Sequence, residues 1–195
     1  MARLVYNVGI NDLKGDKTRP NGTDCPIYSK WSQMLQRCYS EPYLKDRPTY
    51  RGCTVCEEWK TFSNFMAWLT KQKNWEKFEL DKDILVPGNK HYSPETCVLV
   101  SHDLNNALSQ FNRGCGVWQR KSGRWACDFH HKGKRVNLGT FADREVAHQK
   151  FIDYKTKNFK DKIKNLTESD TSDLKKTKQG LLRHIEAKSF LNEST

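Results

Sequence analysis

The chain has 195 residues, of which 36% are hydrophobic and 29% charged, and its formal net charge is +11. A positive charge of this size favours an anionic partner. No apolar run approaches the roughly 20 residues of a membrane-spanning helix, so no membrane partner is expected. The N-terminal residues lack the apolar core of a signal peptide. The chain has seven cysteines, an odd number that cannot all pair in disulfides within the chain. Together these features are typical of reduced thiols in a cytoplasmic protein.

The N-terminal part of the chain predicts two packed helices. Residues 1–24 are interpreted as an extended arm with one strand at Leu4–Val8. A helix is expected at about 28–39, because four apolar residues recur at i, i+3, i+4 and i+7: Trp31, Met34, Leu35 and Cys38. After a predicted loop over 41–52, a second helix is expected at about 59–71. Its apolar side carries Trp59, Phe62, Phe65, Met66 and Leu69.

A β-hairpin followed by a helix is predicted over 78–111. Phe78–Val86 and Thr96–Val100 are expected as the strands, with turn residues at 87–89 between them. Ser101 is the expected cap of the helix. The buried side of that helix carries Leu104, Leu108 and Phe111.

Three further strands and a helix are predicted over 116–151. The strands are Val117–Lys121, Arg124–His130 and Arg135–Phe141, separated by the turn signals Ser122-Gly123 and Lys132-Gly133. Alternation in the second strand places Trp125, Cys127 and Phe129 on one face and Arg124, Ala126, Asp128 and His130 on the other. A helix capped by Asp143 follows, and its apolar stripe of Val146, Ala147, Phe151 and Tyr154 covers one face of the sheet.

The remaining residues contain a linker at 166–173 and a predicted helix at 175–191, which either packs on the protein or contacts a partner. The apolar residues of this helix are Leu181, Leu182, Ile185 and Phe190. The expected fold class is therefore α+β. N-terminal helices and a ββα unit are followed by a three-stranded antiparallel sheet packed on a helix, and then by a helical tail. The predicted domains are residues 1–111, 112–160 and 161–195.

The three-stranded segment resembles the plant-type AP2/ERF DNA-binding domain. The resemblance rests on Gly116-Val117, on Gly123-Arg124-Trp125-Ala126 and on the run from Arg135 to Phe141, R-V-N-L-G-T-F. It implies that the sheet lies in the major groove of duplex DNA. The implied DNA-facing residues are Trp118, Arg120, Arg124, His130, Arg135 and Asn137.

This segment departs from the family at several positions. The family usually has Arg where this chain has Cys115, Trp118 and His130, and Trp where it has Ser122 and Asn137, so its base preference is not carried over. Charge supports the same partner independently. Residues 112–162 hold 13 Lys and Arg against 5 Asp and Glu, which gives +8.

The preceding segment, from about residue 28 to 108, resembles a phage-type variant of the HNH, or His-Me finger, homing endonucleases. The motif blocks are Trp31 to Tyr39, Val55 to Phe65, L-D-K-D-I-L from Leu80, Y-S-P-E-T-C from Tyr92, and Asn105-Asn106. The resemblance implies phosphodiester hydrolysis with a divalent metal, Mg²⁺ or Mn²⁺. It makes Asp81 the metal-ligand candidate and Asn105 or Asn106 the partner on the helix.

The position of the usual base histidine holds Lys82, which is a poor base at neutral pH when it is solvated. His91 in the loop, or His102 at the helix start, could take over that role, so the catalytic candidates are Asp81, Lys82 and His91. Strand alternation places Asp83 on the same face as Asp81, which suggests a joint metal site. Cys53-x-x-Cys56 has the spacing of zinc ligands, but a structural site needs four, and buried reduced thiols are the expected state.

The sequence therefore predicts two alternative functions. The first is site-specific binding and metal-dependent cleavage of double-stranded DNA. The alternative is a catalytically inactive DNA-binding protein that acts as a repressor or site blocker, which Lys82 favours. An RNA-associated protein is the weaker third class, because the deep, narrow groove of A-form RNA excludes a sheet. The oligomeric state stays open, with a homodimer as one alternative.

Overall fold

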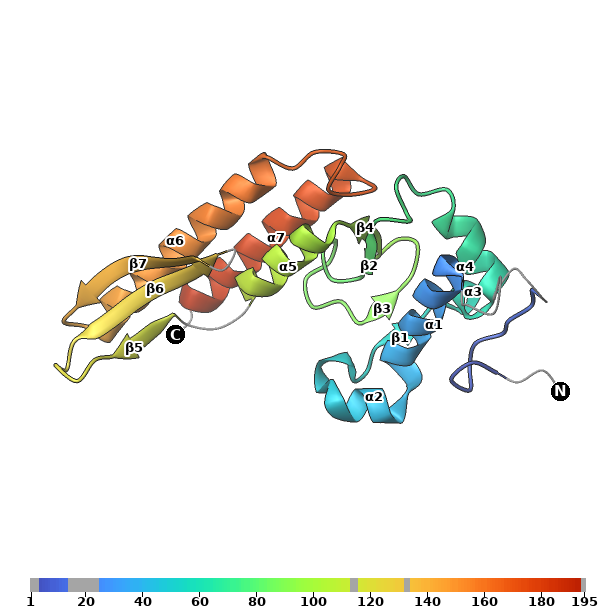
Figure 1. The fold of residues 1–195 in the computed structure, drawn as a ribbon, viewed down its shortest axis with the longest axis horizontal. Coiled ribbons are helices and arrows are strands. Elements are labelled where there is room, and N and C mark those ends of the chain that lie inside the picture. Colours follow the sequence, from blue (N-terminus) through green and yellow to red (C-terminus); the bar gives the residue numbers. More distant parts are fainter. Residues whose placement is uncertain (1–3, 14–24, 113–115, 132–133, 194–195) are drawn as a thin grey trace. The chain divides into compact units, whose positions relative to one another are not determined.

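The structure is a computed structural model that describes residues 4–13, 25–112, 116–131 and 134–193. The chain forms two compact units (Figure 1). Residues 1–102 and 167–195 make up the first unit, and residues 103–166 make up the second. The mixture of helices with a three-stranded antiparallel sheet confirms the α+β class. None of the described helices is long and apolar enough to cross a membrane.

The core of the first unit forms where helix α1 (Pro26–Tyr39) packs against α4 (Phe62–Leu69). The predicted stripe of α1 is confirmed, because Trp31, Met34, Leu35 and Cys38 are its buried residues. Trp31 lies 5.2 Å from the ring of Phe62, and its indole N–H donates to the carbonyl of Trp59 at 2.7 Å. The expected second helix is split into α3 (Glu57–Lys60) and α4, with Thr61 in extended conformation between them.

Two local predictions for the first unit are wrong. Leu4–Val8 is not a strand, because Val5 and Gly9 exchange backbone hydrogen bonds of 2.8 Å around a tight turn. Tyr6 and Asn7 have positive φ angles in that turn. The expected loop at 41–52 instead contains α2 (Glu41–Asp46) and the 3-10 helix η3 (Pro48–Tyr50), each with a proline in its first turn.

The predicted hairpin strands pair, but both are shorter than expected. Strand β2 (Glu79–Asp81) is antiparallel to β4 (Val98–Val100), and α5 (His102–Asn112) follows directly in the chain. Leu104, Leu108 and Phe111 are the buried residues of α5, as predicted. The intervening residues contain β3 (His91–Tyr92), which pairs in parallel with β1 (Thr54–Val55).

The C-terminal helix α7 (Leu174–Glu193) belongs to the first unit and packs on the residues that follow β2. The ring nitrogen Nε2 of His184 donates to the carbonyl of Asp83 at 2.8 Å, and Arg183 donates to the carbonyl of Leu85 at 3.0 Å. At Gly180 a Cβ atom would lie 2.2 Å from the carbonyl oxygen of Ile84, so only glycine allows this approach. Leu181 and Ile185 are buried as expected, whereas Leu182 is 43% exposed. The side chain of Phe190 lies outside the described residues.

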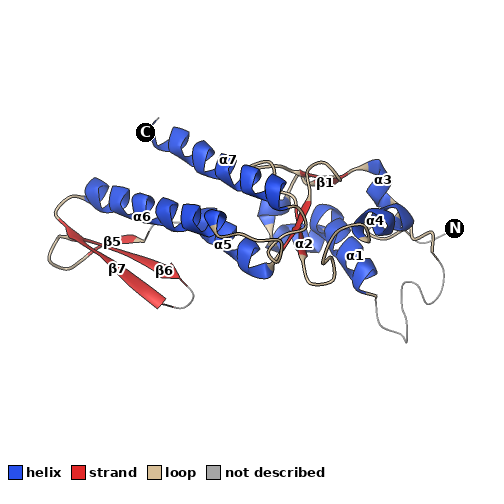
Figure 2. Cartoon of the chain, turned by 90° about the horizontal axis from the view of Figure 1, so that it is seen from above, coloured by secondary structure: helices blue, strands red, loops and turns tan. Residues whose placement is uncertain are grey.

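The second unit contains the sheet β5-β6-β7 and helix α6, which covers one face of that sheet (Figure 2). The strands are β5 (Val117–Gln119), β6 (Trp125–His131) and β7 (Lys134–Phe141), and all neighbours are antiparallel. Cys127 and Phe129 pack against Ala147 and Phe151, as alternation predicts. Lys132 and Gly133, the predicted second turn, lie outside the described residues.

Helix α6 (Arg144–Lys164) begins where predicted, and the Asp143 carboxylate accepts from the backbone N–H groups of Glu145 and Val146. Val146 is 54% exposed, so this part of the expected apolar stripe is wrong. The helix continues to Lys164, beyond the composition change near residue 158, because Phe159 and Ile163 extend its buried side.

Candidate functional site

The outer face of the sheet, which is the face turned away from α6, carries all six side chains that were predicted to face DNA. Residues directly opposite each other on antiparallel strands share a face. Trp118 pairs with Ala126, and His130 pairs with Arg135. Asn137 pairs with Asp128 beyond a bulge, and the Arg120 N–H donates to the Arg124 carbonyl at 2.8 Å. The six side chains are exposed: Trp118, Arg120, Arg124, His130, Arg135 and Asn137.

An acidic residue, Asp128, lies at the centre of this basic face, and the sequence assigned it no role. Its carboxylate accepts a hydrogen bond from Nε of Arg135, and the Arg135 guanidinium lies 5.1 Å from the ring centroid of Trp118. The second carboxylate oxygen lies 3.7 Å from Nε2 of His130. The Asp128 side chain is only 7% exposed, whereas those of Arg135 and His130 are 56% and 70% exposed. Alternation had placed Asp128 beside His130, so the signal was present in the sequence.

Two other members of the set also support the sheet itself. Arg124 donates from Nη2 to the carbonyl of Thr140 at 3.1 Å, which links β6 to β7. The side-chain oxygen of Asn137 accepts from the N–H of Gly139 at 2.9 Å, next to the bulge. Gly139 has a φ of +126°, which glycine adopts without strain. The amide NH₂ of Asn137 is thus the group left to face a partner.

Asp81 ends strand β2 and turns the chain. Its Oδ1 accepts from the N–H groups of Asp83 and Ile84, both at 2.7 Å, and this local pairing ends the predicted strand at Asp81 instead of Val86. Burial raises the pKa of Asp81 to about 6, although these two backbone hydrogen bonds oppose the rise. Within the described residues, Oδ2 of Asp81 accepts no hydrogen bond.

Lys82 is buried, and its ammonium is fully engaged by the protein. Nζ donates to both carboxylate oxygens of Asp83, at 2.7 and 2.8 Å, and to the carbonyl of Asn89 at 2.8 Å. It also lies 5.9 Å from the ring centroids of both Tyr50 and Tyr92. Asp83 lies past the end of the strand, so alternation does not apply to it. Both of its carboxylate oxygens accept hydrogen bonds from Lys82.

The two histidine candidates lie in different surroundings. His91 is exposed on β3, and its Nδ1 lies 2.8 Å from the hydroxyl of Thr54. His102 begins α5, and its Nδ1 lies 2.7 Å from a carboxylate oxygen of Glu79 on β2. Glu79 and Asp81 share one face of β2 because they are two residues apart. A histidine held by a carboxylate has the pairing that orients a general base.

The helix partners predicted for a metal, Asn105 and Asn106, lie on α5 in the second unit, where Asn105 is half-buried and Asn106 exposed. Across the described part of the chain, no three His, Cys, Asp or Glu side chains form a group that could hold a metal ion. Comparisons with family models, curated proteins and solved structures found no match to this chain.

The cysteines in the described ranges are all free. Burial raises the pKa of the Cys53 and Cys56 thiols, and it raises that of Cys38 to about 12.

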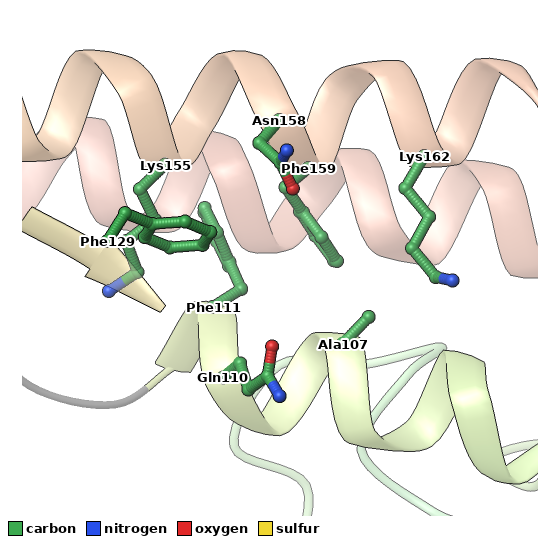
Figure 3. Close-up of a pocket in the computed structure, with 8 residues that line it drawn as sticks. All are labelled: Ala107, Gln110, Phe111, Phe129, Lys155, Asn158, Phe159 and Lys162. Carbon is green, nitrogen blue, oxygen red and sulfur yellow. The ribbon is translucent and has the colours of Figure 1, made fainter. Parts of the chain in front are cut away.

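A small cavity in the second unit lies between α5, α6 and β6 (Figure 3). The rings of Phe111 and Phe159 stack at 4.3 Å in its wall, and the buried Lys155 lies beside Phe111. The cavity measures about 20 Å³, which is room for about one water molecule. It is therefore a packing gap and not a substrate site.

Proposed function

We propose that this protein binds double-stranded DNA through the outer face of the β5-β6-β7 sheet. The observation that carries the proposal is the gathering of six predicted DNA-facing side chains on this one exposed face. The opposite face of the sheet is covered by α6 and its apolar contacts, so of the two faces of the sheet the outer one is open to a partner.

The chemistry of the face fits duplex DNA. The B-form major groove admits β-strands, and arginine and asparagine are the side chains that pair with guanine and adenine edges there. The +8 charge over residues 112–162 supplies cations for phosphate contacts. Double-stranded RNA is the poorer fit, since its deep, narrow major groove excludes such a sheet.

Metal-dependent cleavage of the bound DNA is the second candidate function, and Asp81 favours it. Burial disfavours the ionised carboxylate of Asp81, and Oδ2 is left uncommitted among the described residues. A cation there would offset that cost. A carboxylate kept at a position that opposes its ionisation is a common mark of a functional site. A bound Mg²⁺ or Mn²⁺ would supply charge stabilisation at the phosphate.

Within this candidate function, Lys82 is not available as a base, because three acceptor atoms hold its ammonium. His102 with Glu79 is the better supported proton acceptor in the first unit. Asp83 supports the loop through Lys82. If Asp81 binds no metal, the protein is a DNA-binding repressor or site blocker.

Two experiments separate these functions. Selection from a randomised duplex library, followed by binding titrations at several salt concentrations, tests DNA recognition. Incubation of the selected duplex with Mg²⁺ or Mn²⁺ then tests cleavage. Tight, selective binding without cut ends would leave the repressor or site blocker as the function, whereas absence of selective binding would refute the proposal.

A further inference from the structure

The three arginines of the outer face are held in different ways. The guanidinium of Arg120 makes no hydrogen bond to any residue that the structure describes. Arg124 uses one terminal nitrogen to contact the carbonyl of Thr140. Arg135 alone is fixed on two sides, by the Asp128 carboxylate at Nε and by the ring of Trp118 under its plane.

This arrangement leaves the two terminal nitrogens of the Arg135 guanidinium available for a partner. Because Asp128 engages Nε, the two terminal nitrogens remain, and in the described ranges they donate to no protein group. The Arg135 side chain is 56% exposed, while that of Asp128 is 7% exposed. The Asp128 carboxylate thus lies on the protein side of the guanidinium. There it orients the two terminal nitrogens of Arg135 without presenting a negative charge to phosphates.

The two parallel N–H groups of an oriented guanidinium match the O6 and N7 acceptors of guanine in the major groove. A flexible arginine loses more conformational entropy in forming the same pair, because its fork is not pre-organised. A mobile side chain such as that of Arg120 suits phosphate contacts, where exact orientation matters little, whereas a fixed one such as that of Arg135 suits selective base contacts.

We infer that Asp128 is a positioning residue that makes Arg135 the guanine-reading side chain of the sheet. This inference rests on the proposed function. It adds that one acidic residue, buried in a basic face, sets the sequence preference at a single base pair. Its loss should change which sequences are preferred more than it changes total affinity.

The test is a selection from a randomised duplex library with wild type, Asp128→Asn, Arg135→Lys and Arg120→Lys. Asp153→Asn is the matched control, since it removes the same charge from the exposed side of α6, where Asp153 accepts a hydrogen bond from Gln149 at 2.8 Å. We expect Asp128→Asn and Arg135→Lys to lose preference at the same guanine, by roughly 5- to 150-fold in affinity ratio. Arg120→Lys and Asp153→Asn should keep it, and salt slopes should stay equal.

Combining Asp128→Asn with Arg135→Lys should cost no more selectivity than either change alone, because both act on one contact. Retention of the guanine preference in Asp128→Asn would overturn the inference, as would a loss spread over all positions together with a lower melting temperature. If Asp128→Asn does not fold, Arg135→Lys decides, and its retention of the preference refutes the assignment. If wild type selects no sequence at all, the proposed function fails and this inference fails with it.

Discussion

Replacing Lys82 with methionine should destabilise the first unit without disturbing DNA binding by the sheet. Methionine keeps the length and the apolar stem of the side chain but removes the ammonium. The ammonium donates to both oxygens of Asp83 and to the carbonyl of Asn89. The amide of Asn89 donates back to the carbonyl of Lys82 at 2.8 Å. The pair therefore closes the loop between β2 and β3.

The magnitude follows from what each partner loses. A hydrogen bond from a charged donor contributes about 1.5–3 kcal/mol, and this applies to the Asn89 carbonyl. The Asp83 side chain is 41% exposed, so water replaces much of the ion pair, whose contribution is at most about 1 kcal/mol. Relief from burying an ammonium offsets part of the sum. We expect a net loss of about 2 kcal/mol.

Urea unfolding followed by tryptophan fluorescence measures this change, because four of the six tryptophans lie in the first unit: Trp31, Trp59, Trp68 and Trp75. With an m-value of about 2 kcal/mol/M, the midpoint should fall by about 1 M. Lys71→Met, at an exposed position, is the control and should change stability by less than about 0.5 kcal/mol. A Lys82→Met variant as stable as this control would refute the structural role of Lys82.

Three further predictions concern the same unit. Because burial raises the pKa of Asp81 to about 6 from 3.8, its contribution to stability is present below pH 3.8 and is lost as pH rises through 6. The rise corresponds to at most about 3 kcal/mol, so Asp81→Asn should melt higher than wild type at pH 7 and equally at pH 3. If Asp81 binds a divalent cation, Mn²⁺ should raise the melting temperature of wild type but not of Asp81→Asn, and equal shifts would place the cation elsewhere. Gly180→Ala should destabilise by about 1–3 kcal/mol despite its better helix propensity, because the new Cβ meets the Ile84 carbonyl. Thermal unfolding of this variant beside Gln179→Ala, at an exposed neighbour, measures it, and equal stabilities would show that α7 does not pack there.

The second unit was largely predictable because its signals are local. Alternation in Trp125–His131, glycine at the turn after Ser122 and the Asp143 cap each act within a few residues. The six residues of the outer face came from the resemblance to the AP2/ERF domain, and alternation in the second strand independently placed Arg124 and His130 on one face. The hydrogen bond between Asp128 and Arg135 was not predicted, because it joins side chains on different strands that lie diagonally opposite each other.

The first unit was less predictable, because its decisive contacts are non-local or reverse a local pattern. The alternation of Asp81, Lys82 and Asp83 suggests a strand, yet the Asp81 carboxylate binds the next backbone N–H groups and turns the chain. The parallel pair of β1 and β3 joins residues 37 apart. The contact of α7 with residues 83–85 spans about a hundred positions, and no periodicity reports it.

The most direct test of DNA recognition by the sheet compares two triple variants of equal charge change. One replaces Arg120, Arg124 and Arg135 on the outer face with alanine, and the other replaces Lys150, Lys157 and Lys160 on the exposed side of α6. Binding to a selected duplex and to a scrambled duplex is measured across a salt series. We predict that the arginine variant loses at least about 100-fold in affinity for the selected duplex and all preference over the scrambled one. The lysine variant should keep the preference, and wild type should show a log–log salt slope of about −0.9 per phosphate contact. An arginine variant that still prefers the selected duplex would contradict the account.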